Sequence, residues 1–228
     1  MADQGRVVAT EEFQYVVTGD AVTVSASVKR RVRGSDGTLG DFIKRMSLTA
    51  DALDFGLRSY TSNLEFDKHI QVKGVVPGDT AMTVYGDLDG AGTADRLVQP
   101  PGRLFIMDPG MFTLFDVISR NLRGKPFKTR PINIVALGET TVTVEAMVTD
   151  MGADTLLWGS RRTPTRKLKL SDPSGDFTVW SGSKGQLIRL EHAASDLVVM
   201  REPDALPVKP ASAVKKAPAK KPAGAATR

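Results

Sequence analysis

The sequence predicts a mainly β protein. We expect one curved antiparallel sheet, a half-barrel or barrel-like sheet of about 10–11 strands, with one covering α-helix near residues 109–123. Short segments alternate apolar and polar side chains, Gly, Pro, Asp or Ser bounds most of them, and one stretch alone has clear helical spacing. Strands and helices do not alternate along the chain, so a parallel doubly wound sheet is not expected.

The segment AVTVSASVKRRVR, residues 21–33, shows the strand pattern most clearly. Its apolar side chains point to one side and its polar side chains to the other, which is typical of an antiparallel sheet with one wet face. Thr18, Gly19 and Asp20 join it to the preceding FQYVV as a hairpin turn. The same pattern recurs in LEFDKHIQVKG, AMTVYG, PINIVALG, TTVTVEAMVT, TLLWGS, RKLKLS, DFTVWS, QLIRLEH and LVVMRE.

Composition excludes several kinds of chemistry. The chain has no cysteine, which removes disulfides, thiolate zinc sites and cysteine nucleophiles. It has two histidines, so one chain cannot supply a site with three histidine ligands. Aromatic residues make up 6% of the chain, too few for a row of base-stacking platforms. No phosphate-binding glycine-rich loop occurs, and we expect no cofactor.

The net charge of +5 comes from the end of the chain, where residues 204–228 carry six basic residues and one acidic residue. Residues 1–203 are therefore formally neutral, unlike a nucleic-acid-binding domain, and we expect no sequence-specific nucleic acid. The tail is rich in Pro, Ala and Lys, a composition that predicts disorder. Its candidate contacts with an anionic surface are Lys215, Lys216, Lys220 and Lys221.

We expect a single β-rich domain over residues 11–203, between a loose leader at 1–10 and the disordered tail at 204–228. No long structureless segment divides this domain. The chain has no run of about 18 apolar residues and its start has no apolar signal-peptide core, so neither a membrane span nor a signal peptide is predicted.

The stretch MDPGMFTLFDVISRNLRGKPF, Met107 to Phe127, carries the predicted helix. Asp108 fits the N-cap and Pro109 the first helical position. Gly124 then ends the helix, with Pro126 just beyond.

This helix has a wide apolar face. Its large apolar side chains are Phe112, Leu114, Phe115, Val117, Ile118 and Leu122. Burying them contributes on the order of 10 kcal/mol before ordering costs, at about 1.5–3 kcal/mol each. Three interpretations stay open: a permanent part of the core, a lid over an apolar ligand, or a helix that binds a partner. Under the lid interpretation, Phe112, Leu114, Phe115, Ile118 and Leu122 contact the ligand, and Trp158 and Trp180 line the sheet.

Two other stretches offer weaker signals. Asp87, Asp89 and Asp95 match three positions of a calcium loop, but Val98 stands where a bidentate Glu is required. A turn that closes a hairpin explains the same residues. The segment SGSKG, 181–185, lacks the first glycine of a nucleophile elbow and lies between two predicted strands, so it indicates a hairpin loop. No catalytic residue is predicted.

The end of the domain resembles a known group of proteins. In residues 165–202 a polar-edged strand is followed by a hairpin with the pattern W-x-x-x-x-G-x-L-x-R-L-E and a short strand ending in Arg-Glu. The pattern is carried by Trp180, Gly185, Leu187, Arg189, Leu190 and Glu191. It resembles envelope half-barrel proteins of Gram-negative bacteria, similar to lipoprotein carriers and related uncharacterised domains. The resemblance implies a sheet around an apolar concavity, helices as a lid, and a periplasmic location.

The first functional hypothesis is therefore a non-catalytic binding protein of the bacterial envelope. It would hold an apolar small molecule, a lipid or a lipidated protein in a concave sheet covered by the helix. One alternative is a structural or scaffolding β protein tethered to an anionic partner by its tail. Another is a hydrolase on an unrecognised β scaffold. A cytoplasmic location is the alternative to the periplasm.

Overall fold

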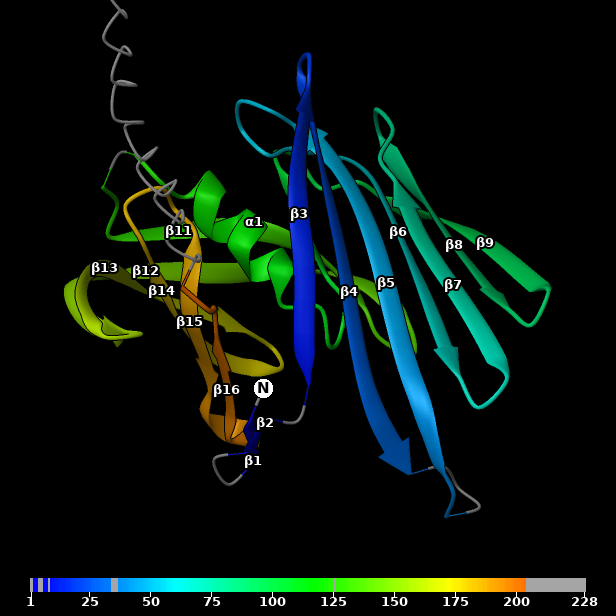
Figure 1. The fold of residues 1–228 in the computed structure, drawn as a ribbon. Helices are drawn as coiled ribbons and strands as arrows, with labels where there is room; N and C mark the ends of the chain where they lie inside the picture. The colour runs from blue at the N-terminus through cyan, green and yellow to red at the C-terminus, as the bar shows by residue number, and fades with distance from the viewer. Residues whose placement is uncertain (1, 4–5, 8, 34–36, 125, 204–228) are drawn as a thin grey trace, which may run out of the picture.

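The computed structural model describes residues 2–3, 6–7, 9–33, 37–124 and 126–203 (Figure 1). In these residues two seven-stranded sheets pack around one α-helix, α1 (Thr113–Asn121). The predicted fold class, mainly β with one helix, is confirmed. The strands form two large sheets where the sequence indicated one. The basic tail and its four candidate lysines lie outside the described residues.

The N-terminal sheet is a meander in which each strand pairs with the next in antiparallel fashion. Its strands are β3 (Thr10–Thr18), β4 (Ala21–Arg33), β5 (Leu39–Asp51), β6 (Leu57–Phe66), β7 (His69–Val76), β8 (Ala81–Leu88) and β9 (Ala91–Val98). In β4 the residues at 22, 24, 26 and 28 are buried, whereas their neighbours are only partly buried, as the alternation predicted. One face of this sheet therefore forms core and the other faces solvent.

The C-terminal sheet follows the chain in the same simple order. Its strands are β10 (Leu104–Met107), β11 (Thr129–Leu137), β12 (Thr141–Trp158), β13 (Arg161–Asp172), β14 (Gly175–Ser181), β15 (Leu187–His192) and β16 (Leu197–Met200). A short 3₁₀ turn, Ala193–Ser195, links the last two strands. The small pair β1 (Ala2–Asp3) and β2 (Arg6–Val7) lies beside β16, in a segment predicted to be a loose leader (Figure 1).

One pair in the C-terminal sheet departs from the antiparallel expectation. Strand β10 pairs with β11 in parallel, and α1 is the crossover between them. A parallel pair needs such a crossover, because a tight hairpin cannot join strands that run in the same direction. The short strand LFIM is buried at its first three residues, which fits a strand covered on both faces.

The C-terminal sheet curls around the helix. Helix α1 contacts β10, at one edge of the sheet, and also β14 and β15, near the opposite edge. In a flat sheet with this strand order, one helix could not contact strands near both edges. Figure 1 shows α1 with the C-terminal sheet around it and the N-terminal sheet beside it. The helix thus occupies the concave face that the sequence hypothesis assigned to a ligand.

The helix and the two residues before it contribute side chains to two hydrophobic clusters. Met111, Leu114 and Val117 pack with the buried face of the N-terminal sheet. Phe112, Phe115 and Ile118 pack with the inner face of the C-terminal sheet. Burial on both sides shows that most of this helix is permanent core. No helix in the described part of the chain is long and apolar enough to cross a membrane.

Candidate functional site

An apolar pocket of about 420 Å³ opens beside the N-terminal end of α1, between the β11–β12 hairpin and the β13–β14 turn. We call it the apolar pocket. The side chains that define it are Met107, Phe112, Phe115, Val142, Val144, Phe177 and Leu197. Its volume falls within the range of about 300–1,000 Å³ that is typical of small-molecule sites. Such sites are mostly apolar with a few polar groups, and this one has that character.

Aromatic rings form one wall of the apolar pocket. The ring of Phe115 on the helix lies 4.9 Å, centroid to centroid, from that of Phe177 on β14. Phe177 in turn stacks on His192, its cross-strand partner on β15, at 4.3 Å. His192 Nδ1 lies 2.7 Å from Ser195 Oγ. The histidine therefore supports the ring of Phe177.

The turn that leads into the helix is anchored to the N-terminal sheet. Asp108 is buried, and its carboxylate accepts hydrogen bonds from the Lys44 ammonium and, at 2.7 Å, from the Tyr60 hydroxyl. Lys44 Nζ also donates to the carbonyl of Pro109 at 2.8 Å. Gly110 adopts a φ of +84°, which favours glycine, and completes the turn. Asp108 and Pro109 both line the apolar pocket, so this cluster fixes one of its walls.

Burial shapes the electrostatics of this cluster. Burial lowers the pKa of the Lys44 ammonium, while the Asp108 carboxylate acts in the opposite direction. Burial, reinforced by the charge of Asp108, raises the pKa of Tyr60 well above its ordinary value, so the phenol stays protonated and donates. Both oxygens of Asp108 are thus occupied, and the side chain is held in place as a structural group.

The helix starts later than the sequence predicted. Asp108 is not its N-cap, because the carboxylate turns to Lys44 and Tyr60. The first regular residue is Thr113, and Phe112 holds the N-cap position without a capping side chain of its own. The predicted bounds of 109–123 therefore shorten to Thr113–Asn121.

A carboxylate from another strand replaces the missing cap. Glu11 on β3 accepts the backbone N–H groups of Phe112, at 2.8 Å, and Thr113, at 3.1 Å. Burial raises the pKa of Glu11, although these hydrogen bonds favour its ionised form. The first N–H groups of a helix have no partner within it, so Glu11 serves as a remote cap that ties β3 to the helix.

Asp116 joins the helix to both sheets. It is 1% exposed and accepts the Tyr15 hydroxyl of β3 at 2.5 Å and the Leu187 N–H of β15 at 2.5 Å. Arg120, one turn along the helix, donates to it at 2.6 Å. Burial raises the pKa of Tyr15, with the Asp116 charge adding to the effect, so this phenol also remains a donor. Three elements therefore converge on one buried carboxylate.

The structure separates the predicted ligand-binding residues. Phe112 and Phe115 line the apolar pocket. Leu114 faces the N-terminal sheet, and Ile118 lies in the core of the C-terminal sheet. Leu122 lies in the same core and lines a different pocket, at the other end of the helix.

The two tryptophans lie away from the apolar pocket. The indole N–H of Trp180 donates to Asp154 at 2.8 Å, and its ring lies between the side chains of Lys167 and Arg189. Trp158 Nε1 donates to the carbonyl of Arg201 at 2.6 Å. The two indole hydrogen bonds therefore link β12 to β14 and to the residue after β16, across the C-terminal sheet.

The calcium candidates lie on the β8–β9 hairpin, where Asp87 bonds within the turn and Asp89 bonds to strand β7. Asp87 accepts the Gly90 N–H at 2.8 Å, and Asp89 accepts the Ile70 N–H at 2.8 Å and contacts His69. Asp95 lies exposed on β9. Within the described ranges, no three His, Cys, Asp or Glu side chains come together as a metal site.

Sequence reasoning missed the strand residues of the apolar pocket. Val142, Val144, Phe177 and Leu197 were assigned to strands, but nothing indicated that they share a cavity. The cross-strand pairing of Phe177 with His192, 15 positions apart, could have been predicted from the sequence, because the two residues flank the hairpin at 181–185. The placement of Val142 beside the helix depends on long-range packing, for which a single sequence carries no signal.

No protein-family model matches the chain, and no curated protein matches its sequence. Among solved structures, a β-barrel-like protein of the domain of unknown function DUF1849 from Brucella abortus is similar, with a TM-score of 0.54, 8% identity and 82% coverage of both chains. A DUF1089 family protein from Pseudomonas aeruginosa has a TM-score of 0.50 and 12% identity, covering 80% of this chain and 88% of that one. The expected similarity to uncharacterised β-rich domains is confirmed at the level of the fold. The similarity to lipoprotein carriers stays a prediction.

Proposed function

We propose that this β-barrel-like domain is a non-catalytic binding protein that holds an apolar ligand, such as a lipid acyl chain, in the apolar pocket beside α1. The observation that carries the proposal is the pocket itself: about 420 Å³, with a wall made by Phe115 and Phe177. Covering apolar surface of this kind with an apolar ligand removes it from water, which lowers the free energy and favours binding. A location in the bacterial envelope rests on the sequence resemblance alone.

The polar groups around the pocket support binding over catalysis. Asp108 has both oxygens engaged by Lys44 and Tyr60. Asp172 accepts the N–H groups of Ser174, at 2.7 Å, and Gly175, at 3.2 Å, and so closes the β13–β14 turn. A general acid or base needs a free proton-transfer atom within reach of the substrate. Both carboxylates that line the pocket serve the fold.

The ligand reaches the apolar pocket without movement of α1, in contrast to the lid interpretation of the helix. Glu11 and Asp116 bind the helix to the N-terminal sheet, and both hydrophobic clusters include its side chains. Moving α1 would break these contacts together. The ligand therefore enters beside the helix, past the exposed side chain of Val142, and α1 forms a fixed wall.

A fluorescent fatty acid tests the proposal. Titration of cis-parinaric acid into the wild type should give saturable fluorescence enhancement. Ala136→Phe places a ring into the apolar pocket and should weaken binding about tenfold or more, the equivalent of about 1.4 kcal/mol. The matched control is Ala94→Phe on the exposed edge strand β9, which should bind as the wild type does.

Phe115→Ala provides the complementary change. Enlarging the apolar pocket should alter probe affinity while the probe still binds, because the other walls remain. If neither the wild type nor Phe115→Ala takes up the probe, the proposed function is wrong. Equal binding by Ala136→Phe and the wild type would place the probe elsewhere and reject this site.

A further inference from the structure

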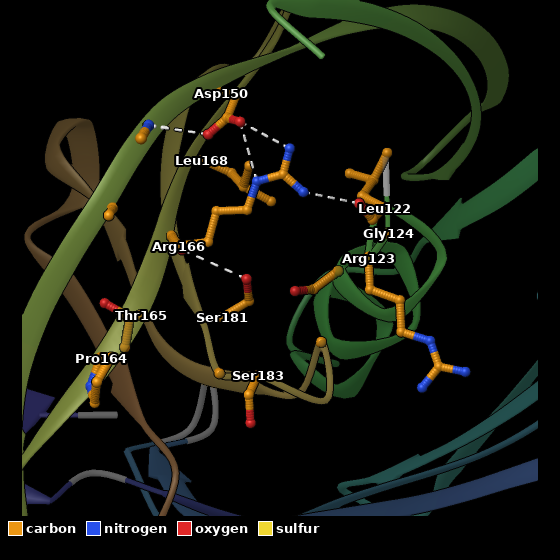
Figure 2. A pocket seen from close by; sticks show the side chains of 15 residues that line it. Leu122, Arg123, Gly124, Asp150, Pro164, Thr165, Arg166, Leu168, Ser181 and Ser183 are labelled. Atoms are coloured by element: carbon orange, nitrogen blue, oxygen red, sulfur yellow. Dashed lines mark hydrogen bonds and ion pairs between the residues drawn. The ribbon is translucent and has the colours of Figure 1, made fainter. Parts of the chain in front are cut away.

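A second pocket lies at the C-terminal end of α1, and we call it the polar pocket after its three charged side chains, Arg123, Asp150 and Arg166, which lie among apolar residues. Its volume is about 460 Å³, and it lies between the last turn of the helix, strands β12 and β13, and the 181–185 loop (Figure 2). The apolar pocket begins at the opposite end of the helix. The two sites therefore differ in position and in the chemistry of their walls.

The central cation of the polar pocket is already held in place. Arg166 donates to Asp150 through Nε, at 3.1 Å, and through Nη2, at 2.8 Å, and its Nη1 donates to the Leu122 carbonyl at 3.0 Å. Figure 2 shows this side chain reaching from β13 across to the helix end. Three of the five guanidinium N–H groups are used, which leaves two donors in a fixed orientation. One N–H on Nη1 and one on Nη2 remain, and a carboxylate is a strong acceptor for guanidinium donors.

A buried hydroxyl supplies the second observation. Ser119, on the helix, is 2% exposed and lines the polar pocket, and its Oγ has no hydrogen-bond partner among the described residues. A buried hydroxyl without a partner is unfavourable, and in folded proteins such groups nearly always pair. Ser183 adds an exposed hydroxyl at the rim. A ligand that carries hydroxyl groups could donate to and accept from both.

The charges around the polar pocket favour an anion. The hydrogen bonds from Arg166 lower the pKa of Asp150, so that pair is ionised and balanced at neutral pH. Arg123 at the rim is exposed and has no ion-pair partner in the described part of the chain. Figure 2 shows its guanidinium extending away from the Arg166–Asp150 pair. The lining therefore carries one positive charge in excess.

The wall made by the 181–185 loop is closely packed. Gly185 has a φ of +77°, and a Cβ there would lie 2.9 Å from the Cα of Arg120 on the helix. The Gly182 N–H donates to the Gln186 carbonyl at 2.9 Å and closes the loop. This backbone approach holds the loop against the helix and gives the polar pocket a preformed shape.

We propose that the polar pocket is a second ligand site, for a small carboxylate that carries hydroxyl groups, such as a sugar acid. The carboxylate accepts the two remaining N–H groups of Arg166, and a ligand hydroxyl pairs with Ser119 Oγ. Arg123 attracts the anion from the rim. This inference is independent of the apolar pocket and of the function proposed for it.

Titration with D-gluconate, followed by backbone amide NMR, tests the site. Saturable shifts should appear at residues 119–124, 150–153 and 181–185, the segments that line the polar pocket. Sorbitol lacks the carboxylate and hexanoate lacks the hydroxyls, so each should bind there at least about tenfold more weakly. Hexanoate shifts around Phe115 and Phe177 would report the apolar pocket instead.

Serine variants separate binding from stability. Ser119→Ala removes an unpartnered hydroxyl, so the Tm should stay the same or rise, while gluconate affinity falls about fivefold to tenfold. Ser47→Ala, at an exposed position of β5, is the matched control and should change neither the Tm nor the gluconate affinity. The proposal is overturned if gluconate shows no saturable binding up to about 10 mM, ten times the Kd of a weak millimolar complex. Unchanged affinity in Ser119→Ala overturns it as well.

Discussion

Asp116→Asn is the sharpest test of how the helix is held between the sheets. The side chain is 1% exposed and receives donors from β3, from Arg120 and from β15. Asparagine keeps the shape but removes the negative charge and turns one acceptor into an NH₂ group that faces these donors. Hydrogen bonds to a buried charged group are worth about 1.5–3 kcal/mol each.

The expected loss in unfolding free energy is about 3–5 kcal/mol, the cost of breaking a buried ion pair by removing one partner. Little discount for solvent screening applies, because Asp116 is almost fully buried and Arg120 is only 20% exposed at its side chain. Urea unfolding followed by circular dichroism measures the change, with an unchanged m-value showing that the transition is the same one. Asp95→Asn, at an exposed position on β9, is the control and should lie within about 0.5 kcal/mol of wild type. A loss below about 1 kcal/mol in Asp116→Asn would refute this account of the junction.

Three further changes test neighbouring features. Lys44→Met leaves Asp108 buried without its cation and should lower the unfolding free energy, measured in urea, by about 3–5 kcal/mol. The triple change Lys44→Met, Tyr60→Phe and Asp108→Leu removes all three polar groups and should recover most of that loss. An equal loss in both variants would contradict the ion pair between Lys44 and Asp108. The raised pKa of Glu11 means that its contribution to stability is fully present below pH 4.5 and is lost as the pH rises through the folded pKa. The unfolding free energy of the wild type, relative to that of Glu11→Gln, should therefore fall from about pH 4 to pH 7. If this difference does not change with pH, burial does not raise the pKa of Glu11. Gly185→Ala should destabilise by about 1–3 kcal/mol, from positive φ and from contact with the helix backbone, and a Tm equal to that of wild type would contradict the close approach.

The strands were predictable because their pattern is local. In β4 alternate residues are buried, as the valines at 22, 24 and 28 indicated. The helix was predictable for the same reason, since its apolar spacing lies within one stretch. The division into two sheets had a local marker as well: Pro100, Pro101 and Gly102 separate β9 from β10 and could have indicated a break.

The start of the helix and the site depended on distant residues. Asp108 had the right identity and position for an N-cap, but Lys44 and Tyr60, 64 and 48 positions away, bind its carboxylate. Glu11 caps the helix from 101 positions away. Such contacts override local preference, and nothing in the sequence near residue 108 records them. The apolar pocket was half predicted: Phe112 and Phe115 were named from the helix, whereas its strand residues were not.

The most direct test of the central claim is an NMR measurement of contacts between bound dodecanoate and the rings of the protein. If the apolar pocket is the ligand site, intermolecular NOEs should join the acyl protons to the rings of Phe115 and Phe177. The indole protons of Trp180, which lies between Lys167 and Arg189 away from that pocket, should show none. NOEs to Trp180 without any to Phe115 or Phe177, or no binding at all, would contradict the account.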